Sequence, residues 1–168
     1  MVKIKTQKFG DFEIGKMKEQ DLKFLPELCR QYYVESPQES TNIKGMYNNF
    51  ERYKDNEFWY FFVMRHAKET MGYAEVFLHP NLFFDQKPYI TIWWVRIEKK
   101  YRHQGLGKKL IQYIEDFGRE MGADSCCLQA ERSNVVAQKL YESLGYEKDV
   151  GYFKDLTKEK NVFNKKIK

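Results

Sequence analysis

A strand–glycine–helix sequence in the middle of the chain constrains the fold more than any other feature. The segment runs from Tyr89 to Gly107 and reads YITIWWVRIEKKYRHQGLG. Its first part, up to Val95, is almost wholly apolar and favours a strand buried in a sheet. A basic stretch and two closely spaced glycines follow, and an amphipathic segment begins at Leu106. Strand, glycine turn and helix in this order form a general device for holding a phosphate on backbone N–H groups.

Strand-like and helix-like segments alternate along the rest of the chain. From Leu106, apolar residues recur at helical spacing as far as Met121, and Gly122 stands where a C-terminal cap belongs. The predicted strands cover residues 12–17, 58–65, 71–78, 89–97, 125–130 and 146–153, and the predicted helices cover 19–33, 41–53, 106–121 and 133–144. Hairpin-connected strands come first and helix crossovers later, which predicts a mixed α/β (α+β) fold. We expect one domain over residues 1–153 and a polar C-terminal tail over 154–168.

Composition excludes several classes of protein. The 168 residues are enough for one domain with a genuine core. No apolar run approaches the roughly 20 residues that span a bilayer, and MVKIKTQKFG lacks the apolar stretch of a signal peptide. We therefore expect a cytoplasmic protein that does not bind a membrane. Cys29, Cys126 and Cys127 fit neither a disulfide framework nor a zinc site. We expect Cys126 and Cys127, in a short apolar strand, to be reduced thiols packed as small hydrophobes, and we expect no metal.

Three phosphate-binding motifs compete for the glycine pair. The dinucleotide fingerprint needs a third small residue at Leu110 and should open the first βα unit of its domain, so it does not fit. The P-loop needs four residues between its glycines and a Ser or Thr after its Lys, whereas here Lys109 follows Lys108. The pattern R/Q-x-x-G-x-G/A is matched in full by residues Arg102 to Gly107.

The charges around the glycine pair also favour an anion over a simple tight turn. Helix N-termini normally attract Asp and Glu, because the amide dipoles leave positive potential there. This helix opens with Lys108 and Lys109, and no acidic residue lies between Lys99 and Gln112. Such stacked positive charge costs up to about 1 kcal/mol per residue when left alone. It becomes favourable when a di-anion occupies the turn.

The sequence here resembles the GNAT superfamily of N-acetyltransferases, which use acetyl-coenzyme A (acetyl-CoA). The likeness runs from about Met71 to Phe153. It includes the strand ending in WVRI, the turn RHQGLG with its following helix, and Asn134-Val135-Val136-Ala137 followed by YESLGY, which matches the family's N-x-x-A…Y-x-x-x-G-F/Y signature. The resemblance implies a mostly antiparallel sheet of about six or seven strands, splayed after the fourth and flanked by about four helices. Residues 1–70 match only in the order of their elements, and in the family that region helps to form the acceptor pocket.

The resemblance assigns cofactor-binding roles to two stretches of the chain and to several single residues. Backbone N–H groups from Gln104 to Lys108 hold the pyrophosphate. The strand edge from Val95 to Ile97 pairs with the pantetheine arm. Asn134 bonds a pantetheine amide, although Asn is equally favoured there as a helix N-cap. The full set of implied acetyl-CoA contacts is Val95, Arg96, Ile97, Arg102, His103, Gln104, Gly105, Leu106, Gly107, Lys108, Asn134 and Tyr141.

The same resemblance implies a mechanism of direct attack by an amine. The N–H of Val95 stabilises negative charge on the thioester oxygen, and Tyr141 acts as the general acid, although its alternative is a core aromatic. In some family members, a Glu on the central strand acts as the general base, at the position that Thr91 holds here. Glu75, on the neighbouring strand, is the best remaining base, and its alternative is a side chain that faces solvent. Glu98 and His79 are weaker candidates.

Two functional classes besides catalysis stay open at this point. One is a non-catalytic acyl-CoA sensor or interaction module on the same fold. The other is nucleic-acid binding through residues 99–109, which we do not expect because the basic cluster is compact. The acceptor is a small-molecule or peptide amine of unidentified class, and the protein a monomer or homodimer. Aromatic residues interspersed with acids form either a pocket for a cationic amine or, as we prefer, an aromatic core with solvated acids; they are Tyr32, Tyr33, Tyr47, Tyr53, Trp59, Tyr60, Glu35, Glu39, Glu51 and Glu57.

Overall fold

The computed structural model describes residues 4–30, 42–82 and 87–151. The chain divides into two compact units, Met1–Ser133 and Asn134–Lys168. The first contains every strand found in the described residues, and the second contains the helix α4 (Val135–Ser143). The expectation of a single domain over residues 1–153 therefore stays a prediction.

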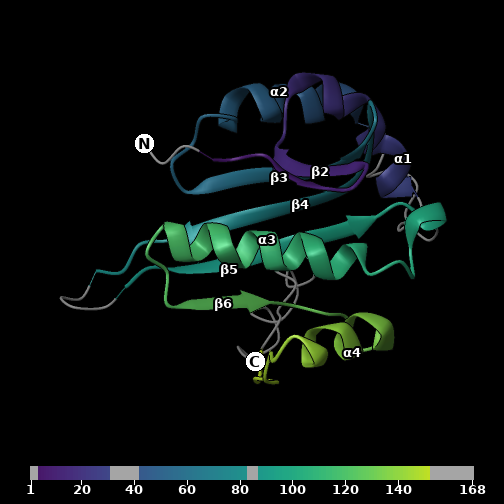
Figure 1. The fold of residues 1–168 in the computed structure, drawn as a ribbon. Helices are drawn as coiled ribbons and strands as arrows, with labels where there is room; N and C mark the ends of the chain where they lie inside the picture. The colour runs from purple at the N-terminus through teal and green to yellow at the C-terminus, as the bar shows by residue number, and fades with distance from the viewer. Residues whose placement is uncertain (1–3, 31–41, 83–86, 152–168) are drawn as a thin grey trace, which may run out of the picture. The chain divides into compact units, whose positions relative to one another are not determined.

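One six-stranded sheet forms the centre of the first unit (Figure 1). The strands lie side by side in chain order, and every pair is antiparallel except the last, β5 with β6. Their bounds are β1 Gln7–Phe9, β2 Phe12–Lys16, β3 Trp59–His66, β4 Glu69–His79, β5 Tyr89–Ile97 and β6 Ser125–Leu128. The predicted mixed fold with a mostly antiparallel sheet is confirmed. The parallel pair follows from the long crossover between its strands, which contains a helix.

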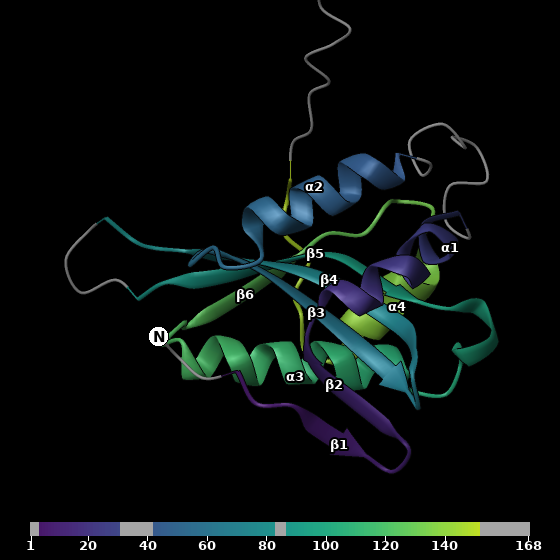
Figure 2. The same cartoon turned by 90° about the horizontal axis from the view of Figure 1, so that it is seen from above.

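Helices cover both faces of this sheet (Figure 2). On one face lies α3 (Leu106–Glu120). On the other lie α1 (Leu25–Arg30) and α2 (Ile43–Tyr53), with the 3₁₀ helix η1 (Glu19–Phe24) leading into α1. A second short 3₁₀ helix, η3 (Lys99–Tyr101), joins β5 to the turn before α3. Each of these layers buries an apolar face of the sheet, as a sheet with two hydrophobic faces requires.

The face beneath α3 is the more tightly packed. Strand residues whose side chains point to this face include Ile14, Phe62, Val76 and Ile90, which are at most 1% exposed. From the helix they meet the predicted apolar stripe, of which Leu110, Ile111, Ile114 and Phe117 are buried. The helix lies so close to the sheet that a Cβ on Gly118 would stand 2.6 Å from a side-chain carbon of Ile90. This packing fixes where α3 begins relative to β5.

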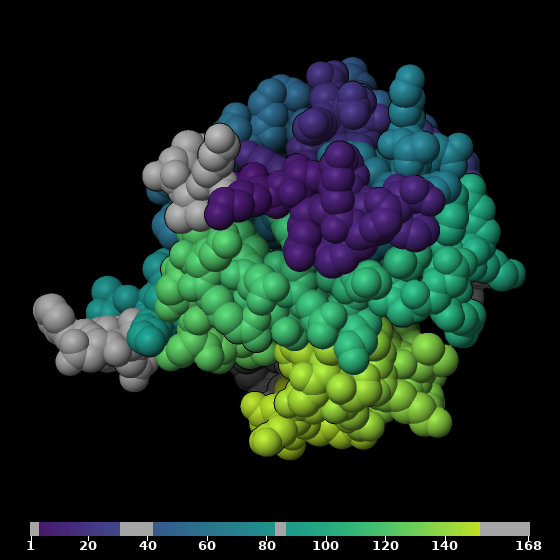
Figure 3. Space-filling view, viewed as in Figure 1, coloured from purple at the N-terminus to yellow at the C-terminus, as the bar shows by residue number. Residues whose placement is uncertain are grey.

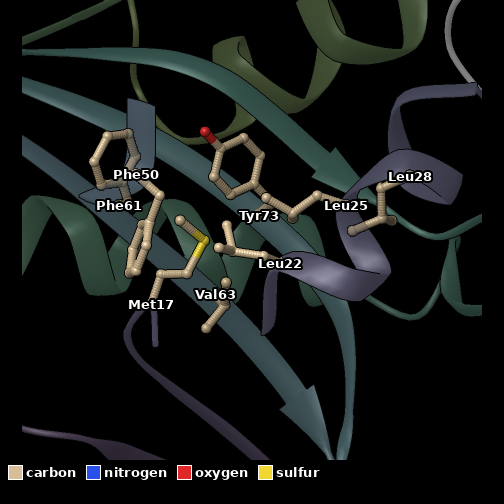
Figure 4. Packing of buried hydrophobic residues seen from close by; sticks show 8 residues of the cluster. All are labelled: Met17, Leu22, Leu25, Leu28, Phe50, Phe61, Val63 and Tyr73. Atoms are coloured by element: carbon tan, nitrogen blue, oxygen red, sulfur yellow. The ribbon is translucent and has the colours of Figure 1, made fainter. Parts of the chain in front are cut away.

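The opposite face holds a second core, shown in Figure 4. It joins η1, α1 and α2 to β3 and β4, and its buried members are Met17, Leu22, Leu25, Leu28, Phe50, Phe61, Val63 and Tyr73. Tyr47, Tyr53, Trp59 and Trp94 pack against it from the margin. The aromatic residues of this region that the structure describes therefore serve mainly as core, as the sequence favoured. Glu51 and Glu57 are exposed, whereas Tyr32, Tyr33, Glu35 and Glu39 lie outside the described residues.

A buried ion pair ties η1 to the sheet. Asp21 is 2% exposed and accepts hydrogen bonds from Arg65 Nε at 2.8 Å and Nη2 at 2.6 Å. It also accepts from the Thr70 hydroxyl at 2.7 Å and the Lys18 amide at 2.7 Å. Burial alone would raise the pKa of Asp21, but these hydrogen bonds outweigh it, and the pKa is lowered. The carboxylate and the guanidinium thus neutralise each other inside the fold.

The sequence missed the N-terminal strand. β1 pairs with β2 through a tight turn in which Gly10 has φ of 58°. The hairpin lies against α3 in the space-filling view (Figure 3), where the Tyr113 hydroxyl donates to the Lys5 carbonyl at 2.7 Å. The Lys109 ammonium lies 4.8 Å from the centre of the Phe9 ring. Three residues with one apolar side chain are too short a pattern to be recognised as a strand.

Three other expectations need correction. Residues 146–151 form no strand, because Glu147, Lys148 and Asp149 interrupt any apolar alternation; residues 152–153 are outside the described residues. The helix expected over residues 19–33 starts as 3₁₀ and becomes α-helical at Leu25, next to Pro26, a residue that favours a helix's first turn. Cys127 is exposed rather than packed, because it lies on the face of β6 away from α3.

Candidate active site

A β-bulge interrupts β5 in the middle of the sheet. Tyr73 of β4 is opposite Arg96, and Glu75 is opposite Trp93, so two steps along β4 correspond to three along β5. The extra residue lies at Trp94, whose φ of 34° is rare for a bulky side chain. Such strain is found mostly where function needs it. The bulge therefore marks Trp94 and Val95 as the special point of this strand.

The sheet diverges at the same point. β6 is in register with β5 only from Tyr89, opposite Ser125, to Ile92, opposite Leu128. Within the described residues, the ladder between these strands ends at Ile92, two residues before Trp94. The expected splay after the fourth predicted strand is therefore confirmed, with β5 as that strand. An open strand edge of this kind is suited to an extended ligand that forms β-type hydrogen bonds.

The predicted anion turn leads from this strand into α3. Gly105 is the N-cap of the helix with φ of 73°, and no side chain caps the helix there. His103 also has positive φ, at 62°. A Cβ on Gly105 would meet nothing within 4 Å, so the glycine serves the backbone conformation and leaves open space beside it. The first turn of α3 contains no acidic residue. Uncapped N–H groups, open space and positive potential together fit a phosphate.

Side chains around this turn are exposed but not all extended toward solvent. Arg102 donates from Nε to the carbonyl of Ile97 at 2.9 Å, which folds it back onto the end of β5. Gln104 donates to the Lys100 carbonyl at 3.4 Å. His103 and Lys108 are exposed, and Leu106 is buried under the sheet. The turn is thus anchored at Arg102 and Leu106, with its backbone open between them.

The predicted base Glu75 does not face solvent. Its partly buried carboxylate lies on the α1/α2 face, where it accepts from Trp59 Nε1 at 3.1 Å and from the Tyr73 hydroxyl through a very short hydrogen bond. Burial raises the pKa of the Glu75 carboxyl, and these two hydrogen bonds offset part of the rise. Burial and the charge of Glu75 raise the pKa of Tyr73 well above its usual value, so Tyr73 remains a donor.

Two further residues complete the surroundings of Glu75. Arg96 lies on the same face, with its guanidinium carbon 4.7 Å from the centre of the Trp94 ring. Arg96 also donates from Nη1 to the Val95 carbonyl at 3.1 Å. The bulge is the cause of this placement, because without it Trp93 and Arg96, three residues apart, would point to opposite faces. Thr91 shares the face, opposite Phe77.

The weaker base candidates lie elsewhere. The Glu98 carboxylate is 3.4 Å from the Lys100 ammonium, beyond the end of β5. His79 stacks on Tyr89 with ring centroids 4.4 Å apart, at the far end of the β4–β5 pair. Neither side chain lies at the bulge, and Glu75 is therefore the acid nearest to it along the register of β4.

Asn134 and Tyr141 belong to the second unit. Asn134 is the N-cap of α4, where its side chain accepts from the Ala137 amide at 3.1 Å. The N-cap interpretation of Asn134 is therefore confirmed, and its predicted role in cofactor binding stays a prediction. Tyr141 is partly exposed, with its ring centroid 6.2 Å from that of Tyr146. Its carbonyl accepts the amides of Leu144 and Tyr146, which closes the helix.

Sequence reasoning missed the bulge, Tyr73 and the side chain of Arg96. The bulge had one signal: Ile90 and Ile92 alternate regularly, and the consecutive residues Trp93 and Trp94 then break the alternation. Tyr73 had none, because an aromatic residue in a strand normally indicates core. Among the residues that the structure describes, no group of three or more His, Cys, Asp or Glu is arranged to hold a metal ion. In the same residues, no helix has the length and apolar character that crossing a membrane requires.

Comparisons with known proteins point to one family. The model of the acetyltransferase (GNAT) family matches residues 23–146. The [Ribosomal protein bS18]-alanine N-acetyltransferase of Escherichia coli (strain K12) is 34% identical over 56 residues. That match spans 33% of this chain and 38% of the length of that enzyme.

Solved structures share the fold at low sequence identity. A transcriptional regulator from Bacillus halodurans C-125 superposes with a TM-score of 0.76 at 20% identity, covering 84% of this chain and 97% of its own. The aminoglycoside N-acetyltransferase AAC(6')-Iy, in complex with CoA, gives a TM-score of 0.70 at 17% identity over 93% of this chain and 99% of its own. The splayed sheet and the open turn before α3 agree with the family match, and the chain belongs to the GNAT family of acetyltransferases.

Proposed function

We propose that this protein transfers an acetyl group from acetyl-CoA to an amine by direct attack of the amine. The observation that carries the proposal is the bulge at Trp94 and Val95, one register step from the carboxylate of Glu75. A backbone donor and a base are the two groups that the reaction needs on the protein side. The position of both on one strand pair supports catalysis over simple binding of an acyl-CoA.

Acetyl-CoA supplies an activated acetyl group and, as the bond breaks, a thiolate. The residues present fit it: the turn from Gln104 to Lys108 offers uncapped N–H groups to its pyrophosphate, with Arg102, His103 and Lys108 adding charge. The edge from Val95 to Ile97 offers β-type hydrogen bonds to its extended arm. Asn134 and Tyr141 are proposed contacts by family resemblance alone.

Glu75 acts in this proposal as the general base. A primary amine with a pKa near about 10.4 is almost wholly protonated at neutral pH and cannot attack until it loses a proton. The raised pKa of Glu75 brings its carboxylate closer to the amine in basicity. Its two neutral donors, Tyr73 and Trp59, fix the side chain without cancelling its charge.

Val95 and Tyr141 stabilise the charges that develop on the thioester. The N–H of Val95 donates to the thioester oxygen as that oxygen gains negative charge. Tyr141 donates its phenolic proton to the departing sulfur. Since a phenol has a pKa of about 10 and a thiol about 8.5, this transfer is uphill by about 2 kcal/mol, which a short contact to the sulfur can offset.

The proposal is tested by thiol release from acetyl-CoA with polyamines, amino acids, aminoglycosides and peptides bearing free N-termini or lysines. We expect release with at least one class. Tyr141→Phe should then lower kcat about tenfold or more, whereas Tyr146→Phe, the neighbouring tyrosine of the same unit, should leave it unchanged. Tight CoA binding without release in any assay would instead favour a non-catalytic acyl-CoA sensor. An unchanged rate in Tyr141→Phe would remove Tyr141 from the mechanism.

A further inference from the structure

The side chain of Arg96 has no role in the mechanism above, which uses only its backbone. The register of the sheet puts it opposite Tyr73, on the face that also carries Glu75. Residues directly opposite in an antiparallel pair have neighbouring side chains. The bulge is responsible for this placement, so the same distortion that singles out Val95 also delivers a positive charge to the acceptor side of the strand.

The charge of Arg96 acts on two other groups of this face, Cys29 and Tyr73. Burial raises the pKa of the Cys29 thiol, and the positive charge of Arg96 offsets part of that rise. The same charge also lowers the pKa of Tyr73, although burial has the larger effect and raises that pKa. Since the Tyr73 hydroxyl donates to Glu75, one face of the sheet carries a cation and an anion that both lie beside the same tyrosine.

The chemistry of the Arg96 guanidinium suits a carboxylate, and one of its donors, Nη1, also donates to the Val95 carbonyl at 3.1 Å. With its central carbon 4.7 Å from the centre of the Trp94 ring, the guanidinium meets an aromatic neighbour. A guanidinium forms its hydrogen bonds at its edge, and that fork matches the two oxygens of a carboxylate. Arg96 and Glu75 are diagonal neighbours across the strand pair, since Arg96 is opposite Tyr73 and Glu75 is two residues further along β4. One small molecule can contact both.

We propose that Arg96 binds a carboxylate of the acceptor, which is then an amine of the amino-acid type. Building on the acetyl transfer proposed above, the amino group lies toward Glu75 and the acid group toward Arg96. A polyamine or an aminoglycoside, which carries positive charges alone, is disfavoured by the guanidinium. This choice of substrate differs from that named for the aminoglycoside N-acetyltransferase of similar fold.

The test compares each of a set of free L-amino acids with its methyl ester, with spermidine as a purely cationic acceptor, by thiol release from acetyl-CoA. In the wild type, we expect kcat/KM for the acid to exceed that for the ester about tenfold or more, mostly through KM, as loss of a charge-assisted hydrogen-bond pair implies. Arg96→Gln should bring this ratio close to one, and Arg96→Lys should keep part of it. The ratio is measured within one variant, so a smaller folded fraction does not alter it.

Arg52→Gln provides a matched control. Arg52 is exposed on α2 and lies over the ring of Tyr53 at 5.2 Å, so its variant loses an arginine–aromatic contact outside the cluster. Its acid-to-ester ratio should equal that of the wild type. An unchanged ratio in Arg96→Gln, or spermidine as the best acceptor, would overturn the inference while leaving acetyl transfer intact. Absence of thiol release with every acceptor would instead count against the proposed function, and the inference would fall with it.

Discussion

Two buried polar clusters lie on the same face of the sheet, and they differ in how each carboxylate is compensated. Asp21 is held by a guanidinium at 2.6 and 2.8 Å, and its pKa is lowered. Glu75 is held by a phenol and an indole, and its pKa is raised. A carboxylate paired directly with a cation is stable as an anion and has little tendency to take a proton. A carboxylate fixed by neutral donors keeps its basicity. The first arrangement stabilises the fold, and the second is suited to proton transfer.

The largest effect is expected from removing the second carboxylate. Glu75→Gln keeps the size of the side chain and removes its basicity, so kcat/KM should fall by about 10²- to 10⁴-fold. The acidic limb of the pH profile, in which activity rises as the Glu75 carboxyl loses its proton, should disappear. Steady-state thiol release across pH measures both. Glu57→Gln, which alters an exposed acid just before β3, should match the wild type. An equal loss of kcat/KM in Glu57→Gln would show that Glu75 has no special role as a base.

The next effect concerns stability rather than rate. Asp21→Ala leaves Arg65 buried without its main counter-charge, which should cost about 3–5 kcal/mol in the free energy of unfolding. Because the folded pKa of Asp21 is the lower one, its contribution is present above the unfolded value near about 3.9 and is lost as pH falls through the folded pKa. Denaturant titration at several pH values measures this. Glu27→Ala, which removes the exposed pair with Arg30, should cost at most about 1 kcal/mol.

A subtler change tests the donors of Glu75. Tyr73→Phe removes the hydroxyl that stabilises the Glu75 carboxylate, so the pKa of Glu75 should rise further. The acidic limb of the kcat/KM profile should then move to higher pH by roughly one unit, equivalent to a tenfold loss of activity on that limb. Tyr60→Phe is the control, since the Tyr60 hydroxyl donates to the Glu57 carbonyl instead. A limb that stays in place would show that Tyr73 serves only the core.

The smallest effect is expected at the turn before α3. Gly105→Ala and Gly122→Ala both place a Cβ at positive φ, at 73° and 81°, with nothing within 4 Å in either case. Each should cost about 1 kcal/mol of stability. Only Gly105→Ala should also raise the KM for acetyl-CoA, by a few-fold, because only that glycine lies in the proposed pyrophosphate turn. Equal KM values for acetyl-CoA in the two variants would show that the turn at Gly105 does not bind the cofactor.

Much of this architecture could be predicted from the sequence because its signals are local. The apolar run from Tyr89, the glycine turn and the apolar stripe of α3 each predict one structural element. The family signature then predicts how these elements follow one another. The pairing of Asp21 with Arg65 could not be predicted, since the two residues are 44 positions apart and no pattern links an acid in a short helix to a base in a strand. The surroundings of Glu75 were missed for a related reason. Alternation predicts which face a strand residue occupies, but not whether a helix covers that face.

The bulge in β5 also determines which sequence changes this strand can accept. Deleting one residue between Trp93 and Arg96 would leave two steps on each strand, so a regular ladder with β4 would form and Arg96 would stay opposite Tyr73. The bulge itself would be lost, and with it the unusual backbone at Trp94 that sets the direction of the Val95 N–H. We therefore expect β5 to accept replacement of side chains more readily than loss or gain of a residue. Among distant relatives, the length of this strand should then be kept while its residue types vary.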